Sequence, residues 1–404
     1  MPHTRSVCIG VFIGAGSRDE QPKQAGVSHF VEHLCFKGTE RRPTSKEISE
    51  TIEGVGGVLN GGTDKELTIY WAKVARHHFL LALDLLMDMI RHSRFDPLGI
   101  ENERKVIIEE LNMSLDSPQS RVDTLIDELM WPDQPLGRDV AGSKETVKDI
   151  DRQMLLDCIS RFYLPSNTVV SVAGDMGHNE VVDSVAKYLG DWPDGVAGTW
   201  LSAENIQYAS RLKVEKRKTE QAHLCLAVHG LFNLHPDRFI LDLLNMILGD
   251  GMSSRLFLEL RERKGLAYDI HSHLCYFRDA GSLTIYAGVD PKQLESTIGA
   301  ILEEVNRLKE EQVPEAEVAK VKEMAKGRLM LRMEDTRNVA SWMGVQELLT
   351  GRILSVDEVI AILDGIAADD IRRVAQVLFL ASKLNLAVVG PVGNPGRLEK
   401  LLKL

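Results

Sequence analysis

The chain has 404 residues, of which 44% are hydrophobic and 26% are charged, and its formal net charge is -11 at pH 7. This length exceeds what one hydrophobic core supports and predicts two or more domains, and the composition is that of a soluble globular protein. The negative charge argues against nucleic-acid binding, and the chain has no run of about eighteen apolar residues that could span a membrane.

The cysteines are odd in number and scattered, and the first residues read as polar and then as a strand, without a signal peptide. These features predict reduced thiols and a cytoplasmic protein. The five are Cys8, Cys35, Cys158, Cys225 and Cys275.

Residues 6–16 predict a strand, and the first chemically distinctive pattern follows it at His29-Phe30-Val31-Glu32-His33. This is H-x-x-E-H, the inverted form of the zinc-protease motif. On a helix, His29 and His33 project from the same side, with Glu32 beside them. The apolar residues repeat at helical spacing and form the opposite stripe: Val27, Phe30, Val31 and Leu34. The pattern predicts a helix that presents two metal ligands and a general base.

A solvated helix face is the competing interpretation, because so short a pattern also arises by chance. The choice depends on a third ligand, since a catalytic zinc takes three protein ligands and leaves a fourth position for water. Cys35 follows His33 by two residues and points away from both histidines, so we interpret it as a packing residue.

A second helix is predicted over about residues 97–115, and it opens at Pro97, which suits a first helical turn. Glu103 and Glu110 lie two turns apart and share a face, whereas Glu109 points elsewhere. A carboxylate among valine and isoleucine side chains needs a partner, because an unpaired buried charge is costly, and a metal supplies one.

The same helix permits a simpler interpretation, in which Glu109 and Glu110 form an exposed acidic pair that faces Lys105 and Arg104. At this point the sequence leaves both interpretations open.

The other histidines favour structural roles. His77 and His78 precede an amphipathic helix and are predicted at the surface. His271 and His273 alternate along a predicted strand and could bind a metal, but alternating polar residues on one strand face are common.

The chain also repeats itself weakly. Residues 97–174 predict three helices and then a strand, and residues 314–390 predict the same order. The repeat predicts two α+β halves, at residues 1–195 and 206–404, which are joined by a linker at 196–205 within a Pro/Gly-rich region. When the halves are aligned, arginine and glutamate replace the two motif histidines, so the second half carries no metal set.

Together these motifs resemble the pitrilysin-type (M16) zinc metallopeptidases, in particular the branch of the mitochondrial processing peptidase β subunit and its bacterial relatives. In that family a helix of the form E-x6-E follows H-x-x-E-H, and its second glutamate is the third ligand. The resemblance, which covers essentially the whole chain, implies one Zn²⁺ per chain held by His29, His33 and Glu110. It implies Glu32 as the general base and Glu103 as an acid that orients a ligand.

Further landmarks agree with this resemblance. The segment from Gly56 to Thr68 is similar to the family's strand beside the active site, where Asn60 would contact the substrate backbone. Gly61 stands where the family usually has alanine. Leu136-Gly137-Arg138 matches another family landmark.

In the second half, the family places an arginine and a tyrosine seven residues apart, and Arg261 and Tyr268 fit that spacing. The resemblance implies that they reach the substrate at the zinc and donate hydrogen bonds to the developing oxyanion. Taken alone, they would read as an ordinary arginine at a helix end and a half-buried tyrosine.

The implied fold is α+β, with two homologous half-chain domains, each a mainly antiparallel sheet packed with helices, that form a clamshell around a peptide chamber. Relatives have a further strand ahead of residue 6, and this chain begins too late to include it. Loss of that strand would expose a sheet edge.

The implied function is a bacterial, cytoplasmic zinc-dependent endopeptidase that hydrolyses extended peptides or unfolded segments. It would act as a homodimer or as a heterodimer with a related subunit. Arginine selectivity does not carry over, because Ser120 and Thr124 stand where mitochondrial relatives have acidic residues. The alternatives are a catalytically silent structural or partner subunit, and a metal-binding module without hydrolysis.

Overall fold

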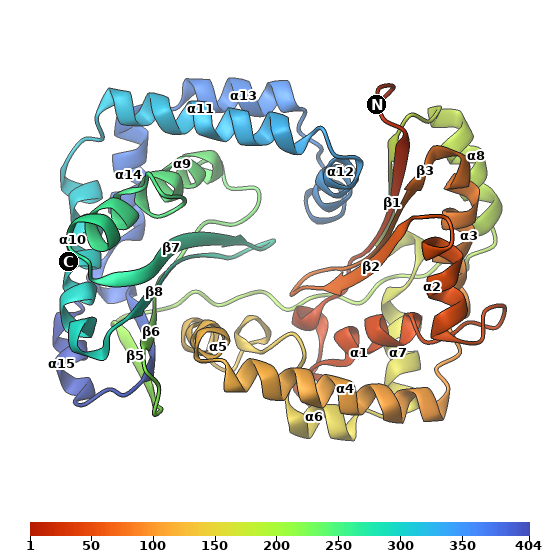
Figure 1. Ribbon diagram of the computed structural model, residues 1–404, viewed down its shortest axis with the longest axis horizontal. Helices are drawn as coiled ribbons and strands as arrows, with labels where there is room; N and C mark the ends of the chain where they lie inside the picture. The colour runs from red at the N-terminus through yellow and green to blue at the C-terminus, as the bar shows by residue number, and fades with distance from the viewer. The chain divides into compact units, whose positions relative to one another are not determined.

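The computed structural model describes residues 1–404, which form two compact units (Figure 1). Each unit contains a mainly antiparallel sheet packed with helices, which confirms the α+β class. None of its helices has the length and apolar character needed to cross a membrane. Unit 1 contains residues 1–112, 138–201 and 330–353, and unit 2 contains residues 113–137, 202–329 and 354–404.

The sheet of unit 1 has the order β2-β3-β1-β4, and all its neighbouring strands are antiparallel. Its strands are β1 (Ser6–Ile13), β2 (Val58–Thr63), β3 (Thr68–Ala75) and β4 (Thr168–Gly174). Its helices are α1 (Val27–Cys35), α2 (Ser45–Glu53), α3 (Phe79–His92), α4 (Pro97–Asp116), α6 (Lys144–Asp149), α7 (Arg152–Phe162), α8 (His178–Leu189) and α12 (Thr336–Thr350). The predicted helix at about 97–115 is therefore present as α4.

Strand β1 is buried on both faces, and its side chains alternate between two layers of helices. Val7, Ile9 and Val11 belong to the core that includes helices α1 and α3. Cys8 belongs to a second cluster on the opposite face, together with Ala340 of α12. The strand is a continuous hydrophobic run because both faces are covered.

The sheet of unit 2 has the order β5-β9-β6-β8-β7, and only the pair β5–β9 is parallel. Its strands are β5 (Arg211–Lys216), β6 (Ala222–His229), β7 (Ala267–Tyr276), β8 (Gly281–Val289) and β9 (Asn385–Gly390). Its helices are α5 (Pro118–Met130), α9 (Arg238–Leu248), α10 (Leu294–Glu310), α11 (Glu315–Arg332), α13 (Val356–Gly365), α14 (Ala368–Leu378), α15 (Pro395–Leu401) and the π-helical turn η6 (Phe257–Arg263).

The two sheets match strand for strand, β2-β3-β1-β4 against β7-β8-β6-β9, as the predicted repeat requires. Within residues 97–174 and 314–390, four helices, not the predicted three, precede β4 and β9, because α6 and its counterpart α13 are additional short helices. In unit 2 the strand β5 covers the outer edge of β9, whereas β4 lies at an open edge of unit 1. A groove of about 760 Å³ runs beside β4 and is lined by α8 and α12.

The units are not the contiguous halves that the sequence suggested, because they exchange one helix each. Helix α5 comes from the first half and packs on β6 and β9 of unit 2. Helix α12 comes from the second half and packs on β1 and β4 of unit 1. Each of these helices covers the equivalent face of its sheet. The two units therefore keep matching architectures, although each contains a helix from the other side of the predicted linker.

Candidate metal centre

Helix α1 begins at a position that only glycine suits. Gly26 has φ +94°, and a Cβ atom there would lie 2.4 Å from the carbonyl oxygen of Ala141. The buried carboxylate of Glu20 accepts hydrogen bonds from the backbone N–H groups of Gly26 and Ser28, both at 2.7 Å. These bonds satisfy donors that a helix start leaves unpaired, and they fix the direction of α1.

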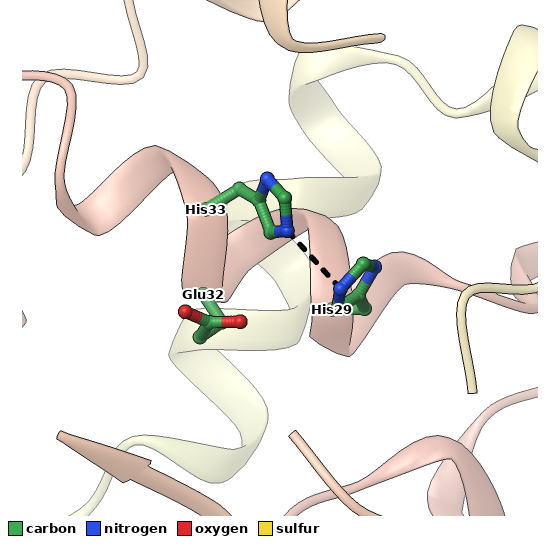
Figure 2. A group of neighbouring side chains, drawn as sticks. All are labelled: His29, Glu32 and His33. Atoms are coloured by element: carbon green, nitrogen blue, oxygen red, sulfur yellow. Dashed lines mark hydrogen bonds between the residues drawn. The ribbon is translucent and has the colours of Figure 1, made fainter. Parts of the chain in front are cut away.

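The predicted amphipathic division of α1 is present. The apolar stripe is buried in the core of unit 1. On the other side, the rings of His29 and His33 face each other, with their Nε2 atoms 3.1 Å apart, and the Glu32 carboxylate lies beside them (Figure 2). These three residues form a cluster whose ligand atoms all lie within 4.8 Å of one another.

Helix α4 brings two carboxylates to these histidines. Oε2 of Glu110 lies 3.6 Å from Nε2 of His33 and 4.0 Å from Nε2 of His29. Oε1 of Glu103 lies 3.0 Å from Nδ1 of His33, on the far side of that ring. The two glutamates therefore contact opposite nitrogens of one imidazole.

The alternative of an exposed acidic pair does not describe α4. Glu109 is exposed, but Glu110 faces the two histidines. Arg104 pairs with Glu101 and donates to the carbonyl oxygen of Val147, so it does not neutralise Glu110.

The electrostatics of the pair keep one histidine neutral. Burial, with the charge of His33 in addition, lowers the pKa of His29 to about 4. Burial would also lower the pKa of His33, but the hydrogen bond to Glu103 and the charges of Glu32 and Glu110 outweigh it and raise that pKa. A ligating imidazole must be neutral, and His29 meets that condition at neutral pH.

Glu32 has a raised pKa. Burial raises its pKa, with contributions from the charges of Glu110 and Glu103, although His33 opposes the shift. A carboxylate with a raised pKa takes and returns a proton more readily near neutral pH than an ordinary exposed glutamate.

The donor set fits a zinc ion. Two imidazole nitrogens and one carboxylate oxygen are typical ligands of a catalytic zinc. Bonds of about 2.0–2.1 Å in a tetrahedral arrangement place ligand atoms about 3.4 Å apart. The separations here are 3.1, 3.6 and 4.0 Å, so the three atoms could surround one ion with small adjustments.

Strand β2 runs beside Glu32 at the free edge of the sheet. A Cβ atom at Gly61 would lie 2.8 Å from Oε1 of Glu32, so glycine at this position leaves room for the carboxylate. Asn60 is exposed, and its side-chain oxygen accepts a hydrogen bond from the N–H of Gly61. β2 pairs only with β3, which leaves its other edge open to an added strand.

Arg261 and Tyr268 lie together in unit 2. Arg261 is on the π-helical turn η6, and its guanidinium lies 5.6 Å from the centre of the Tyr268 ring and 4.7 Å from that of Phe257. The Tyr268 side chain is 76% exposed, so it is available to a ligand. Short π-helical turns are frequent at functional sites.

The structure assigns the remaining predicted residues to ordinary positions. His271 and His273 have ring centres 6.2 Å apart and belong to no cluster of three potential ligands. His77 is exposed, and its ring centre lies 4.1 Å from that of His78 with the two rings tilted. Cys35 is fully buried against Tyr70, which agrees with a packing role.

Sequence reasoning missed Lys37, whose Nζ lies 2.7 Å from Oε2 of Glu103. It follows His33 by four residues, so helical spacing could have indicated that it lies on the same side as His33.

Comparisons with known proteins agree on one family. A family model described as insulinase (peptidase family M16) matches residues 1–144, and one described as the peptidase M16 inactive domain matches residues 149–325. An uncharacterized zinc protease of Bacillus subtilis, YmxG, is 38% identical over 97% of this chain and 95% of its own length.

Two solved structures share the fold. A protease from Helicobacter pylori matches with a TM-score of 0.90 at 23% identity, covering 96% of this chain and 94% of that one. A chain of complex III2 from Candida albicans matches with a TM-score of 0.85 at 19% identity, covering 100% of this chain and 96% of that one.

Proposed function

Because the chain belongs to the M16 peptidase family, we propose that it is a zinc-dependent endopeptidase that hydrolyses extended peptides or unfolded segments. The observation that carries the proposal is the convergence of His29, His33 and Glu110 from two helices, with Glu32 beside them. One ion per chain would be held by those first three residues.

Each residue has a defined task in the proposed mechanism. A bound zinc ion would polarise the scissile carbonyl and lower the pKa of a water molecule. Glu32 would take a proton from the attacking water and pass it to the leaving amine, a role that its raised pKa supports. Glu103 accepts a hydrogen bond from the Nδ1–H group of His33 and thereby leaves Nε2 free as a ligand.

The substrate is held, in this proposal, as an added strand on the open edge of β2, with Asn60 contacting its backbone. Arg261 and Tyr268 donate hydrogen bonds to the developing oxyanion within a peptide chamber that excludes folded proteins. We further propose a cytoplasmic protein, supported by its five cysteines, which form no disulfide. We also propose a homodimer active in each subunit, since the chain carries both the metal set and the Arg/Tyr pair.

A catalytically silent structural or partner subunit is the second candidate. The family model over residues 149–325 is described as an inactive domain, and a chain of complex III2 from Candida albicans shares the fold. Unit 1 carries both the proposed ligands and the proposed base. A structural subunit needs none of these residues, so their presence favours an active enzyme.

Cleavage of a quenched fluorescent peptide by the purified protein tests the proposal, with Glu32→Gln run in parallel and zinc quantified in both. We expect about one zinc per chain in each protein and a loss of turnover of roughly 10²- to 10⁴-fold in the variant, because general base catalysis is removed. Zinc without turnover on a broad peptide panel would favour the silent subunit. A folded protein without stoichiometric zinc would refute the metal centre.

A further inference from the structure

We infer that Lys37 is a positioning residue of the metal centre, which holds Glu103 so that Glu103 fixes the ring of His33. The inference rests on the proposed zinc site, and it adds to that site a residue that touches neither metal nor substrate.

The contacts form a chain that leads to the ligand. Nζ of Lys37 lies 2.7 Å from Oε2 of Glu103, and Oε1 of the same carboxylate lies 3.0 Å from Nδ1 of His33. The Nε2 of His33 then faces Nε2 of His29 and the carboxylate of Glu110. Each oxygen of Glu103 therefore has one partner, and the plane of the carboxylate is set from both ends.

Burial makes this arrangement necessary. The side chain of Glu103 is only 6% exposed, so water cannot easily take the place of a lost hydrogen-bond partner. Without Lys37, Oε2 of Glu103 would be left unpaired, and the carboxylate would lower its free energy by rotating away from His33 towards another partner. Removal of one partner of a buried charge is generally more costly than the pair is worth.

Charge supports the same role. Three carboxylates, those of Glu32, Glu103 and Glu110, surround the two histidines. Lys37 is the one lysine or arginine that forms an ion pair with any of them. Its side chain is 38% exposed, so it reaches Glu103 on α4 while still meeting water in part.

Local geometry explains why position 37 can reach α4. The backbone N–H of Lys37 donates to the carbonyl oxygen of Leu34, which continues the last turn of α1. Lys37 is thus about one helical turn beyond His33 on the same side of α1, and both side chains meet Glu103.

The first test measures metal affinity by competition with a chromophoric zinc chelator, without any activity readout. We expect Lys37→Met to weaken zinc binding roughly 10-fold or more, the range seen when a partner of a ligating histidine is lost. Lys37→Arg should restore most of that loss. The matched control is Lys46→Met, which removes an exposed lysine paired with Glu50 on α2 and should leave zinc affinity unchanged.

A double variant shows whether Lys37 acts through Glu103. If it does, Lys37→Met should change zinc affinity less than about 2-fold in a Glu103→Gln background, because coupled residues are non-additive. A full and additive loss in that background would overturn the inference.

The second test does not need zinc. In the metal-free protein, at a pH high enough for His33 to be neutral, ¹⁵N NMR of labelled histidines should show a proton on Nδ1 of His33 and a free Nε2. The His33 signals are assigned by their loss in His33→Asn. Lys37→Met should give a mixture of the two tautomers. An unchanged His33 tautomer together with unchanged zinc affinity would refute the role of Lys37. If the wild type bound no zinc at all, the proposed function would fail, and the tautomer comparison alone would decide the role of Lys37.

Discussion

Glu109 and Glu110 are adjacent in sequence but differ completely in surroundings. Glu109 is exposed, whereas Oε2 of Glu110 lies within 4.0 Å of both histidine Nε2 atoms. We therefore expect Glu110→Gln to weaken zinc binding by about 100-fold or more, since loss of a ligand should exceed the cost of losing an outer partner. Glu109→Gln is the matched control and should bind zinc like the wild type. If equilibrium dialysis showed the same loss of zinc affinity in both variants, the assignment of Glu110 as a zinc ligand would be contradicted.

At the scale of elements, the segment after α1 is tied to helix α3 by a buried carboxylate. Asp88 is buried and accepts hydrogen bonds from Thr39 at 2.7 Å, from Arg41 at 3.0 Å and from Arg42 at 2.6 Å. Burial alone would raise its pKa, but these donors outweigh it and hold the pKa of Asp88 below its ordinary value. This carboxylate anchors the loop that leads from α1 to α2.

A depressed pKa fixes the sign of the pH dependence. A carboxylate of this kind contributes stability above its unfolded pKa of about 4, and the contribution is lost as the pH falls towards the folded pKa. We expect Asp88→Asn to lower the free energy of unfolding by about 3 kcal/mol at pH 7 and to flatten its decline below pH 4. Denaturant unfolding at several pH values would measure both. Asp84→Asn removes a more exposed partner of the same arginines and should lower the free energy of unfolding less than Asp88→Asn does. An equal decrease in the two variants would contradict the central role of Asp88.

At the scale of the whole molecule, the exchange of α5 and α12 determines which fragments can fold. Helix α12 covers Cys8, Trp71 and Ala173 on one face of the unit 1 sheet. Its Arg337 lies 4.0 Å over the Trp71 ring, and Asp335 pairs with Lys73 at 2.5 Å. The sheet of unit 1 is therefore completed by residues far away in sequence.

A fragment of residues 1–201 should consequently be less stable than the same unit in the full chain, because one face of its sheet is uncovered. We expect strong binding of an apolar dye and a broad thermal transition. Addition of a peptide spanning residues 330–353 should reduce the dye signal and sharpen the transition. A fragment that melts cooperatively without the peptide would show that α12 is dispensable for unit 1.

The local features of the site could be predicted from the sequence alone. H-x-x-E-H places two histidines and a glutamate on one side of α1, and the E-x6-E spacing places Glu103 and Glu110 on one side of α4, because helical geometry relates residues within two turns. The internal repeat likewise indicated the equivalent strands β4 and β9. Family resemblance, rather than spacing, selected Glu110 over Glu109.

The features that depend on long-range packing could be seen only once the chain had folded. The tertiary structure brought α4 against α1 with Glu103 and Glu110 on opposite nitrogens of His33, it added Lys37 to Glu103, and it placed α12 on the first half of the chain. A hydrophobic stripe shows that a helix must be covered, but many surfaces can cover it equally well. The partner is chosen by the shape and burial of the whole unit, which no local pattern contains.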